Sequence, residues 1–474
     1  MNKANILTKT DYLLYLDSPM HLWAEKHDRL EEVEPSAFDQ HLRAQGRAVQ
    51  DCAQVYLRNK ISQDYPDAQV HFEIELGDRH FFARLDAAVY YPDEHAWDIY
   101  EIKSGSSIRK EHLLDAAFQR LVALANFKVR DTYLLHLNKQ YRREGEVELD
   151  ALFVIEKVSG PIIELCEELK AGREAAWQTA KADSPDGIET CLKPKECPCP
   201  QLCHPNLPNH SIYNLPRIGS KAKTLRDAGI TAIVDIPSDF NLTVIQARHA
   251  DVVKAGMPVI DHDQLIAALD QMVFPLSFLD YETYNPAVPW YDGYAPHQHI
   301  VFQYSLHLFE ALGSAPVHYE YLATEPEDPS LRLAADLLDK ISPTGSVIVW
   351  NRSFEAGRNR EMAVLHPQYA EGLHSANDRI FDLMEVFSKG YYLHPDFHGS
   401  ASIKNVLPVL APDLSYEELV ISSGDAAMLA WAEMMSGEMD SVAYNQMRQH
   451  LLAYCKLDTW AMVRIWQALL KLVS

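Results

Sequence analysis

An apolar segment that ends in two closely spaced acids constrains the fold most strongly. Residues 274–279 are mainly apolar and lead into Asp280 and Glu282, two positions apart. Side chains at positions i and i+2 of a β-strand point to the same face, so a strand here would set these carboxylates side by side. Like charges raise each other's pKa, and a bound divalent cation would relieve that repulsion. The alternative is an edge strand that carries two solvated acids.

Two later segments could bring further polar side chains to the same site. Residues 347–350 predict a second buried strand, which runs into an N-x-x-F-E sequence that ends at Glu355. Residues 451–458 predict a helix in which Tyr454 and Asp458 lie at i and i+4 on one face. In chain order the three patterns are D-x-E, N-x-x-F-E and Y-x-x-x-D.

This set of patterns resembles the DEDD exonucleases of the RNase H-like fold, in their tyrosine-containing subclass. The resemblance implies that Asp280, Glu282 and Asp458 would hold one Mg²⁺ or Mn²⁺ ion and that Asp280 and Glu355 would hold a second. Two such ions clamp the attacking and leaving oxygens of an in-line displacement. Tyr454 would position the attacking water. The family usually has N-x-x-F-D, so Glu355 is a departure.

The sequence around the first pattern is also similar to an uncharacterised bacterial family, domain of unknown function 2779. Residues 278–286, 302–307 and 399–404 carry this resemblance. In that family a nuclease-like unit ends a longer chain. Asp382, which lies between the second and third patterns, is predicted to start a helix rather than to take part in catalysis.

A second group of polar residues lies in the N-terminal half. Alternating apolar residues over 69–103 predict a meander of strands. Asp86 lies in one of these strands, and Glu101 and Lys103 share one face of the next. A helix carrying Gln119 follows. The alternative is a cross-strand salt bridge on a solvated sheet face.

The arrangement D…E-x-K with a downstream glutamine resembles the RecB-like branch of the PD-(D/E)XK nucleases, including its four-cysteine CRISPR-associated members. Asp86 and Glu101 would hold Mg²⁺ or Mn²⁺, and Lys103 would orient and help to deprotonate the attacking water. Two positions depart from the family. Gln50 stands where relatives often have histidine, and Ser18 stands where the four-cysteine relatives have an N-terminal cysteine.

Four of the seven cysteines crowd into residues 191–203 with the spacing C-x5-C-x-C-x3-C. They are Cys191, Cys197, Cys199 and Cys203. Clustered cysteines in a large cytosolic chain indicate metal or cluster ligation rather than disulfides. The relatives use a [4Fe–4S] cluster that joins the two ends of the nuclease domain. Here Cys199 could replace the ligand lost at Ser18, so that all four ligands would come from one short segment, an arrangement that we call a local clasp. We favour an iron–sulfur cluster; Zn²⁺ and no metal are the alternatives, with His204 as an outside candidate ligand.

Residues 206–270 predict a helical linker that resembles a helix-hairpin-helix. A turn at Ile218, Gly219 and Ser220 would expose backbone N–H groups that can hold a phosphate, and Lys221 and Lys223 would add positive charge. The alternative is an ordinary helical linker that uses its glycines as caps.

The size and charge of the chain limit the possible functions. A chain of 474 residues should form two or three domains. No apolar run is long enough for a membrane span and no signal peptide is apparent, so we expect a cytoplasmic protein with no membrane partner. The net charge of −24 argues against broad polyanion binding. A nuclease needs only local basic patches, and this charge favours one that requires a defined end or a partner.

We therefore predict an α/β multidomain protein with three parts. They are a PD-(D/E)XK restriction-endonuclease-like domain with a C-terminal cysteine cluster at 1–205, the helix-hairpin-helix-like linker at 206–270, and an RNase H-like DEDD exonuclease domain at 271–474. The predicted function is metal-dependent hydrolysis of nucleic-acid ends, with DNA favoured over RNA, in repair, recombination or phage defence. The rival is an end-binding or scaffold protein in which one or both sites are inactive, as the departures at Gln50, Glu355 and Ser18 would favour.

Overall fold

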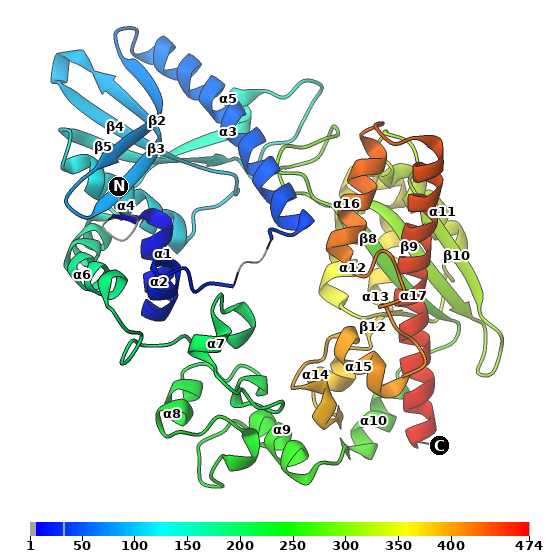
Figure 1. Cartoon of the computed structure of the whole chain (residues 1–474). Helices are drawn as coiled ribbons and strands as arrows, with labels where there is room; N and C mark the ends of the chain where they lie inside the picture. Colours follow the sequence, from blue (N-terminus) through cyan, green and yellow to red (C-terminus); the bar gives the residue numbers. More distant parts are fainter. Residues whose placement is uncertain (1–5, 32–33, 474) are drawn as a thin grey trace. The chain divides into compact units, whose positions relative to one another are not determined.

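The structure, a computed structural model, describes residues 6–31 and 34–473 (Figure 1). The chain forms two compact units, each with its own mixed sheet and helices, which confirms an α/β multidomain protein. The first unit comprises Met1–Asn206 and Pro286–Gln298, and the second comprises Leu207–Asn285 and His299–Ser474. The predicted linker at 206–270 thus belongs, from Leu207 onward, to the second unit. The assignment of 286–298 to the first unit was not predicted.

The first unit is built on a six-stranded sheet with the order β1-β3-β4-β5-β6, in which β2 also pairs with β3. The predicted meander is confirmed, because β2, β3 and β4 are antiparallel neighbours. The β4–β5 pair is parallel, and the intervening chain forms helix α4. The strands are β1 (Leu7–Thr8), β2 (Gln69–Gly77), β3 (Phe81–Tyr91), β4 (Ala96–Lys103), β5 (Val129–Leu137) and β6 (Phe153–Lys157).

Helices cover both faces of this sheet. One core packs Leu85 of β3 and Ile99 of β4 against α1, α4 and α6, and a second packs Val89 and Tyr100 against α3. A Thr8–Asp11 capping box starts α1, and the chain breaks before Pro19 as expected. The helices are α1 (Lys9–Asp17), α2 (Pro19–Lys26), α3 (Ala37–Asp64), α4 (Lys110–Leu124), α5 (Leu149–Leu152), α6 (Ile163–Lys181) and α7 (Pro200–Cys203), with 3-10 turns η2 (Pro92–Glu94) and η3 (Pro194–Glu196).

The second unit has a five-stranded sheet with the order β10-β9-β8-β11-β12. Strands β8, β9 and β10 are antiparallel, whereas β11 runs parallel to both β8 and β12. The β8–β9 register shifts between Glu282 and Thr283. The strands are β8 (Leu276–Tyr284), β9 (Ile300–Phe309), β10 (Val317–Leu322), β11 (Ser346–Val349) and β12 (Ile380–Asp382), and a separate pair joins β7 (Val259–Ile260) to β13 (Tyr392–Leu393).

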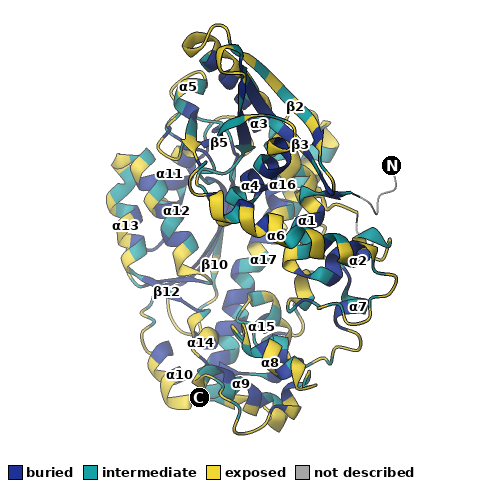
Figure 2. Ribbon diagram, turned by 90° about the vertical axis from the view of Figure 1, so that its left-hand side faces the viewer, coloured by how far each residue is buried: buried dark blue, intermediate teal, exposed yellow. Residues whose placement is uncertain are grey.

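Most helices of the second unit pack their apolar residues on this sheet and leave exposed residues on their outer sides (Figure 2), whereas α8 and α9 share a small core of their own. Among the described residues no helix is both long and apolar enough to cross a membrane. The helices are α8 (Lys221–Asp227), α9 (Val244–Ala255), α10 (His262–Leu269), α11 (Ser330–Lys340), α12 (Arg352–Leu365), α13 (Ala370–Asp378), α14 (Glu385–Ser388), α15 (Ile403–Leu410), α16 (Gly424–Met435) and α17 (Ser441–Val473), with 3-10 turns η4 (Ile212–Asn214), η5 (Ile233–Asp235), η6 (Pro367–Tyr369) and η7 (Pro395–Phe397).

The long helix α17 is held on the sheet by apolar and polar contacts. Trp466 packs on Phe278 of β8, with 5.6 Å between ring centroids. Gln303 of β9 donates from Nε2 to the carbonyl of Leu451 at 2.8 Å. Thr459 lies within hydrogen-bond distance of Ser305, with 2.7 Å between their hydroxyl oxygens. These contacts fix the face of α17 that lies over β8.

Candidate metal centres

Strand β8 presents Asp280 and Glu282 toward α17, as the two-residue spacing predicted. The carboxylate oxygens of these residues and the Sγ of Cys455 all lie within 4.8 Å of one another. Cys455 is fully buried and Glu282 is 7% exposed. The register shift beside Glu282 is a local irregularity of the kind that re-aims side chains near functional sites. Two acids and a thiol thus converge on the inner side of α17.

Helix α17 also carries Asp458, whose carboxylate accepts hydrogen bonds from two tyrosines. The hydroxyl of Tyr416 donates to Oδ1 of Asp458 at 2.6 Å. Burial raises the pKa of Asp458 to about 6, while hydrogen bonds from Tyr416 and Tyr454 oppose part of that rise. Tyr454 is itself buried, and burial and Asp458 raise its pKa far above the ordinary value. Tyr454 therefore acts as a hydrogen-bond donor here and not as a base.

Glu355 lies in the first turn of α12 and is 3% exposed. Its Oε2 atom has no hydrogen-bond partner among the described residues. Burial, with a further contribution from the charge of Asp382, raises the pKa of Glu355 to about 8. Asp382 itself accepts hydrogen bonds from the backbone N–H of Arg352 at 2.9 Å and of Met384 at 3.1 Å. Asp382 is the last residue of β12, and the helix that follows, α14, has Met384 as its N-cap and no side-chain cap. The prediction that Asp382 starts a helix is therefore wrong, and its carboxylate instead accepts from the first residue of α12, a helix earlier in the chain.

The acids of this centre act on one another electrostatically. Burial raises the pKa of Asp280, and the charges of Asp458, Glu282 and Glu355 raise it further. The cationic Lys404, which is exposed, lowers the pKa of Glu282 and Asp458 in part. We call Asp280, Glu282, Glu355 and Asp458 the four-acid centre.

The donor chemistry of the four-acid centre fits a hard divalent cation. Carboxylate oxygens are the ligands that Mg²⁺ and Mn²⁺ prefer, and the unpartnered Oε2 of Glu355 offers one more. Burial and the charge of Asp280 raise the pKa of Cys455 well above its usual range. Cys455 is therefore a neutral thiol, and its Sγ donates to Oδ2 of Asp280 across 3.8 Å.

The sequence did not identify three members of this neighbourhood. Cys455 lies three residues before Asp458, a helical spacing that could have placed both on one face. Lys404 lies in a segment that resembles the uncharacterised family, but no sequence pattern marks it as part of a site. Tyr416 reaches Asp458 from 42 residues away and has no local signal.

The predicted centre of the first unit is also assembled. The backbone N–H of Ile102 donates to Oδ2 of Asp86 at 2.8 Å. Glu101 is 1% exposed, and its Oε1 lies 2.7 Å from Nζ of Lys103. Gln119 of α4 is buried and donates from Nε2 to the carbonyl of Arg84 at 3.5 Å.

Two residues that the sequence did not identify complete this cluster. Nζ of Lys9 lies 3.1 Å from Glu101 and 3.5 Å from Asp115, and Asp115 also pairs with Lys103. Burial opposes the ionisation of Glu101, but Lys103 and Lys9 outweigh burial and lower its pKa. Burial and the charge of Glu101 raise the pKa of Asp86 to about 8.

The two centres therefore differ in how their negative charge is balanced. In the first unit Lys9 and Lys103 pair directly with the acids. In the part of the chain that the structure describes, no ion pair joins a lysine or arginine to any member of the four-acid centre. The first centre nevertheless retains buried oxygens without a partner among the described residues, on Glu101, Asp115 and Gln119, which could bind a cation.

The cysteine segment lies against α2. Sγ atoms of Cys199 and Cys203 are 3.7 Å apart, and Sγ of Cys197 lies 3.5 Å from Nε2 of His21. Cys191 lies 3.1 Å from Nε2 of His204. The predicted convergence of the cysteines is therefore present, together with a histidine that the sequence did not identify.

The predicted phosphate-binding turn at Ile218, Gly219 and Ser220 leads into α8, which has seven residues. The backbone N–H groups of Lys221 and Lys223 bond to the carbonyls of Ile218 and Ser220. Nζ of Lys221 donates to Gln246 at 3.2 Å, and Lys223 pairs with Asp227 at 3.9 Å. Fewer donors face outward than the sequence led us to expect, and nucleic-acid binding by this segment stays a prediction.

Comparison with known proteins identifies part of the second unit. Residues 277–402 match the family described as Domain of unknown function (DUF2779). This confirms the resemblance to that family and covers Asp280, Glu282 and Glu355, but the matched residues end before Tyr454 and Asp458.

Two curated proteins are also similar to this chain, and both are described as uncharacterized. MG366 of Mycoplasma genitalium is 26% identical over 205 residues, which cover 40% of this chain and 31% of that protein. UU173 of Ureaplasma parvum is 23% identical over 297 residues, which cover 57% of this chain and 42% of that protein. The chain thus spans less than half the length of either relative. No solved structure matches it.

Proposed function

We propose that this protein is a metal-dependent nuclease that hydrolyses phosphodiester bonds at nucleic-acid ends, with the four-acid centre as its principal active site. One observation carries the proposal: Asp280, Glu282, Glu355 and Asp458 come together from β8, α12 and α17, so that the charges of the other three raise the pKa of Asp280 and the charge of Asp458 raises that of Glu282. Such a concentration of buried acids, without a paired lysine or arginine among the described residues, is expected of a cation site.

The sheet order supports this proposal. In the second unit Asp280 and Glu282 lie on β8, the central strand, between an antiparallel and a parallel neighbour, an arrangement that we interpret as RNase H-like. In the first unit β4 carries Glu101 and Lys103 beside the parallel strand β5, with α4 between them in sequence, which we interpret as PD-(D/E)XK-like. DNA is the favoured substrate and RNA the alternative.

The roles of the residues follow from their contacts. Asp280, Glu282 and Asp458 would hold one Mg²⁺ or Mn²⁺ and Asp280 with Glu355 a second; such a pair stabilises the attacking and leaving oxygens. Tyr416 fixes the carboxylate of Asp458 by its 2.6 Å hydrogen bond. Lys404, exposed beside the acids, would attract the phosphate of the substrate.

The centre of the first unit supports a second, weaker candidate function. Lys9 and Lys103 already neutralise Glu101 and Asp115, so a cation would have to displace or rearrange existing ion pairs. This observation favours an end-binding role for the first unit, in which its nuclease site is inactive and the four-acid centre alone cleaves.

Digestion assays on the full chain test both functions. Single-stranded DNA, duplex DNA and RNA, labelled at either end, would be incubated with Mg²⁺ or Mn²⁺ and with wild type, Asp280→Asn, Glu101→Gln or the control Glu371→Gln, which alters an exposed acid of α13. We expect Asp280→Asn to abolish stepwise degradation and Glu371→Gln to leave it unchanged. Loss of activity in Glu101→Gln would show that the first centre also cleaves.

Binding assays on the same proteins separate the nuclease from the scaffold. If wild type binds labelled ends but degrades none of the substrates with either metal, the nuclease proposal is wrong and the end-binding protein is favoured. If Asp280→Asn degrades its substrates as fast as wild type, the four-acid centre is not the active site.

A further inference from the structure

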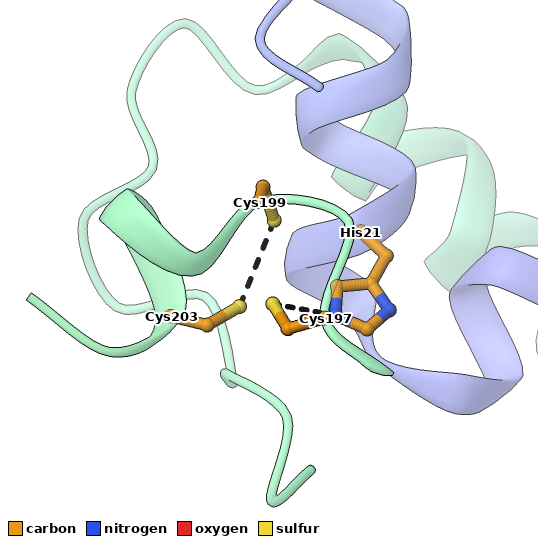
Figure 3. Close-up of side chains that lie close together, drawn as sticks. All are labelled: His21, Cys197, Cys199 and Cys203. Carbon is orange, nitrogen blue, oxygen red and sulfur yellow. Dashed lines mark hydrogen bonds between the residues drawn. The ribbon is translucent and has the colours of Figure 1, made fainter. Parts of the chain in front are cut away.

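The cysteine segment and helix α2 bring four metal-ligating side chains to one point in the first unit. The ligand atoms of His21, Cys197, Cys199 and Cys203 all lie within 4.8 Å of one another. Figure 3 shows His21 reaching from its helix toward the segment that carries the three cysteines, of which Cys203 lies on the short helix α7, and the three sulfur atoms face the same space. The ligands therefore come from two segments that are 176 residues apart in the chain.

Two of the separations between these atoms match the edges of a tetrahedron around one zinc ion. Zn–S bonds of about 2.3 Å and Zn–N bonds of about 2.0–2.1 Å require edges of about 3.8 Å between two sulfurs and about 3.6 Å between sulfur and nitrogen. The observed separations are 3.7 Å for Cys199–Cys203 and 3.5 Å for Cys197–His21. Thiolate and imidazole are also the ligands that structural zinc sites use.

An iron–sulfur cluster fits this arrangement less well. Such a cluster holds its cysteine sulfurs on the outside of a cage of iron and sulfide atoms, so the sulfurs must stand farther apart than around a single ion. Cys191, which the four-cysteine arrangement would also require, lies 3.1 Å from Nε2 of His204 and within 4.8 Å of Cys197, so the sulfurs are crowded rather than spread around a cage. Cys191, Cys197 and His204 form a second possible group, which shares Cys197 with the first and supplies a direct comparison for the experiment.

The surroundings of His21 favour ligation through Nε2. The carboxylate of Asp17 lies 2.9 Å from Nδ1 of His21, although the two are not aligned as a regular hydrogen bond. A carboxylate beside the second ring nitrogen orients metal-ligating histidines and fixes their tautomer. Met20 and Trp23 pack around the cysteines and bury them, and His21 is 1% exposed.

We propose that His21, Cys197, Cys199 and Cys203 bind one structural Zn²⁺ ion that joins α2 to the end of the first unit's main segment. Ser18, expected from the resemblance to match a cysteine ligand, instead donates its hydroxyl to the carbonyl of Glu189 at 2.9 Å. His21, three residues later, supplies the N-terminal ligand. The site therefore links the two ends of the first unit's main segment. This differs from the local clasp, in which Cys199 would have completed a site made of residues 191–203 alone.

Metal analysis of the purified full chain tests the proposal. We expect about one zinc ion per wild-type chain and no iron or acid-labile sulfide, including in protein purified without oxygen. His21→Ala should lose most of the zinc and release the remainder faster to a chelator. The matched controls His204→Ala and Cys191→Ser should keep their zinc, because both residues lie outside the proposed group.

A second variant tests ligation without removing the site. His21→Cys would replace an S₃N ligand set by S₄, so it should retain zinc, and its Co²⁺-substituted form should show visible bands that differ from those of wild type. The proposal is overturned if wild type contains iron and sulfide, if His21→Ala retains zinc as wild type does, or if His21→Cys leaves the cobalt spectrum unchanged. Loss of zinc in Cys191→Ser together with its retention in His21→Ala would assign the metal to the other group.

Discussion

Replacing Glu355 by glutamine should stabilise the metal-free protein at neutral and alkaline pH. Glu355 is 3% exposed, and its Oε2 has no partner among the described residues. Burial raises its pKa from the ordinary 4.5 to about 8. Ionising this carboxyl in the folded state is therefore unfavourable unless a cation is bound. Glutamine has nearly the same shape and carries no charge, so it avoids this penalty.

The sign and size of the effect follow from the two pKa values. Between pH 4.5 and pH 8 the folded protein keeps a proton on Glu355 that the unfolded chain releases, so stability falls as the pH rises through this window. Each pH unit between the two pKa values corresponds to about 1.4 kcal/mol, so the ionised carboxyl lowers the free energy of unfolding by at most about 5 kcal/mol above pH 8. Because the protein relaxes and water enters, we expect about 2–3 kcal/mol to be realised. At pH 4.5 and below the effect should vanish.

Denaturant unfolding between pH 4 and pH 9 with chelator measures this difference. The relevant transition is the one that Mn²⁺ shifts in wild type, since ligand binding stabilises the folded state that holds it. Glu355→Gln should have the higher midpoint at pH 8 and should respond less to Mn²⁺, whereas Glu371→Gln should behave as wild type. The reasoning is refuted if the variant and wild type have equal midpoints at pH 8, or if Mn²⁺ stabilises both equally.

Three further substitutions have definite expected outcomes. Tyr416→Phe removes a hydrogen bond that lowers the pKa of Asp458, so the acid limb of the pH–rate profile should move to higher pH by up to about one unit. Lys103→Met leaves the buried Glu101 with one cation fewer, which should destabilise the first unit by about 3 kcal/mol at pH 8, and by less at pH 4 where Glu101 takes up a proton, as denaturant unfolding would show. Gly345 has φ +75°, and the methyl group that Gly345→Ala adds would meet a backbone carbonyl. Thermal unfolding of the second unit should therefore show a stability lower by about 2–3 kcal/mol.

Short-range spacing made the main elements of both centres predictable. The two-residue repeat of a strand placed Asp280 beside Glu282, and the same rule placed Glu101 beside Lys103. The four-residue repeat of a helix placed Tyr454 near Asp458. These relations depend only on the backbone geometry of one element, so the residues themselves encode them.

Contacts between distant segments were not predictable in the same way. Lys9 reaches Glu101 across 92 residues, and Tyr416 reaches Asp458 across 42. Neither tyrosine nor lysine has a sequence pattern that indicates a partner so far away, because the contact depends on how helices dock on the sheet. His21 also lacks a local pattern. A lone histidine in a helix is ordinarily a structural residue, and the cysteines that it faces lie far away in the sequence.

The division of the chain into units also depended on docking. The composition between 206 and 270 indicated a linker, but that segment packs within the second unit. Pro286–Gln298, which connects β8 to β9 of the second unit, belongs to the first unit, where the backbone N–H of Ala287 donates to the side chain of Gln45 at 2.6 Å. Arg143 likewise donates to the carbonyl of Trp290 at 2.6 Å.

The membership of Pro286–Gln298 in the first unit sets the order in which the protein can mature on the ribosome. Domains generally fold as units during synthesis, the N-terminal one first. Here the first unit remains incomplete until Gln298 has been made. By then β8, with Asp280 and Glu282, has already been synthesised and must wait without its neighbours β9 and β11. The nascent chain thus carries an apolar strand with two acids while the first unit closes, and the acids would reduce its tendency to pair with other chains.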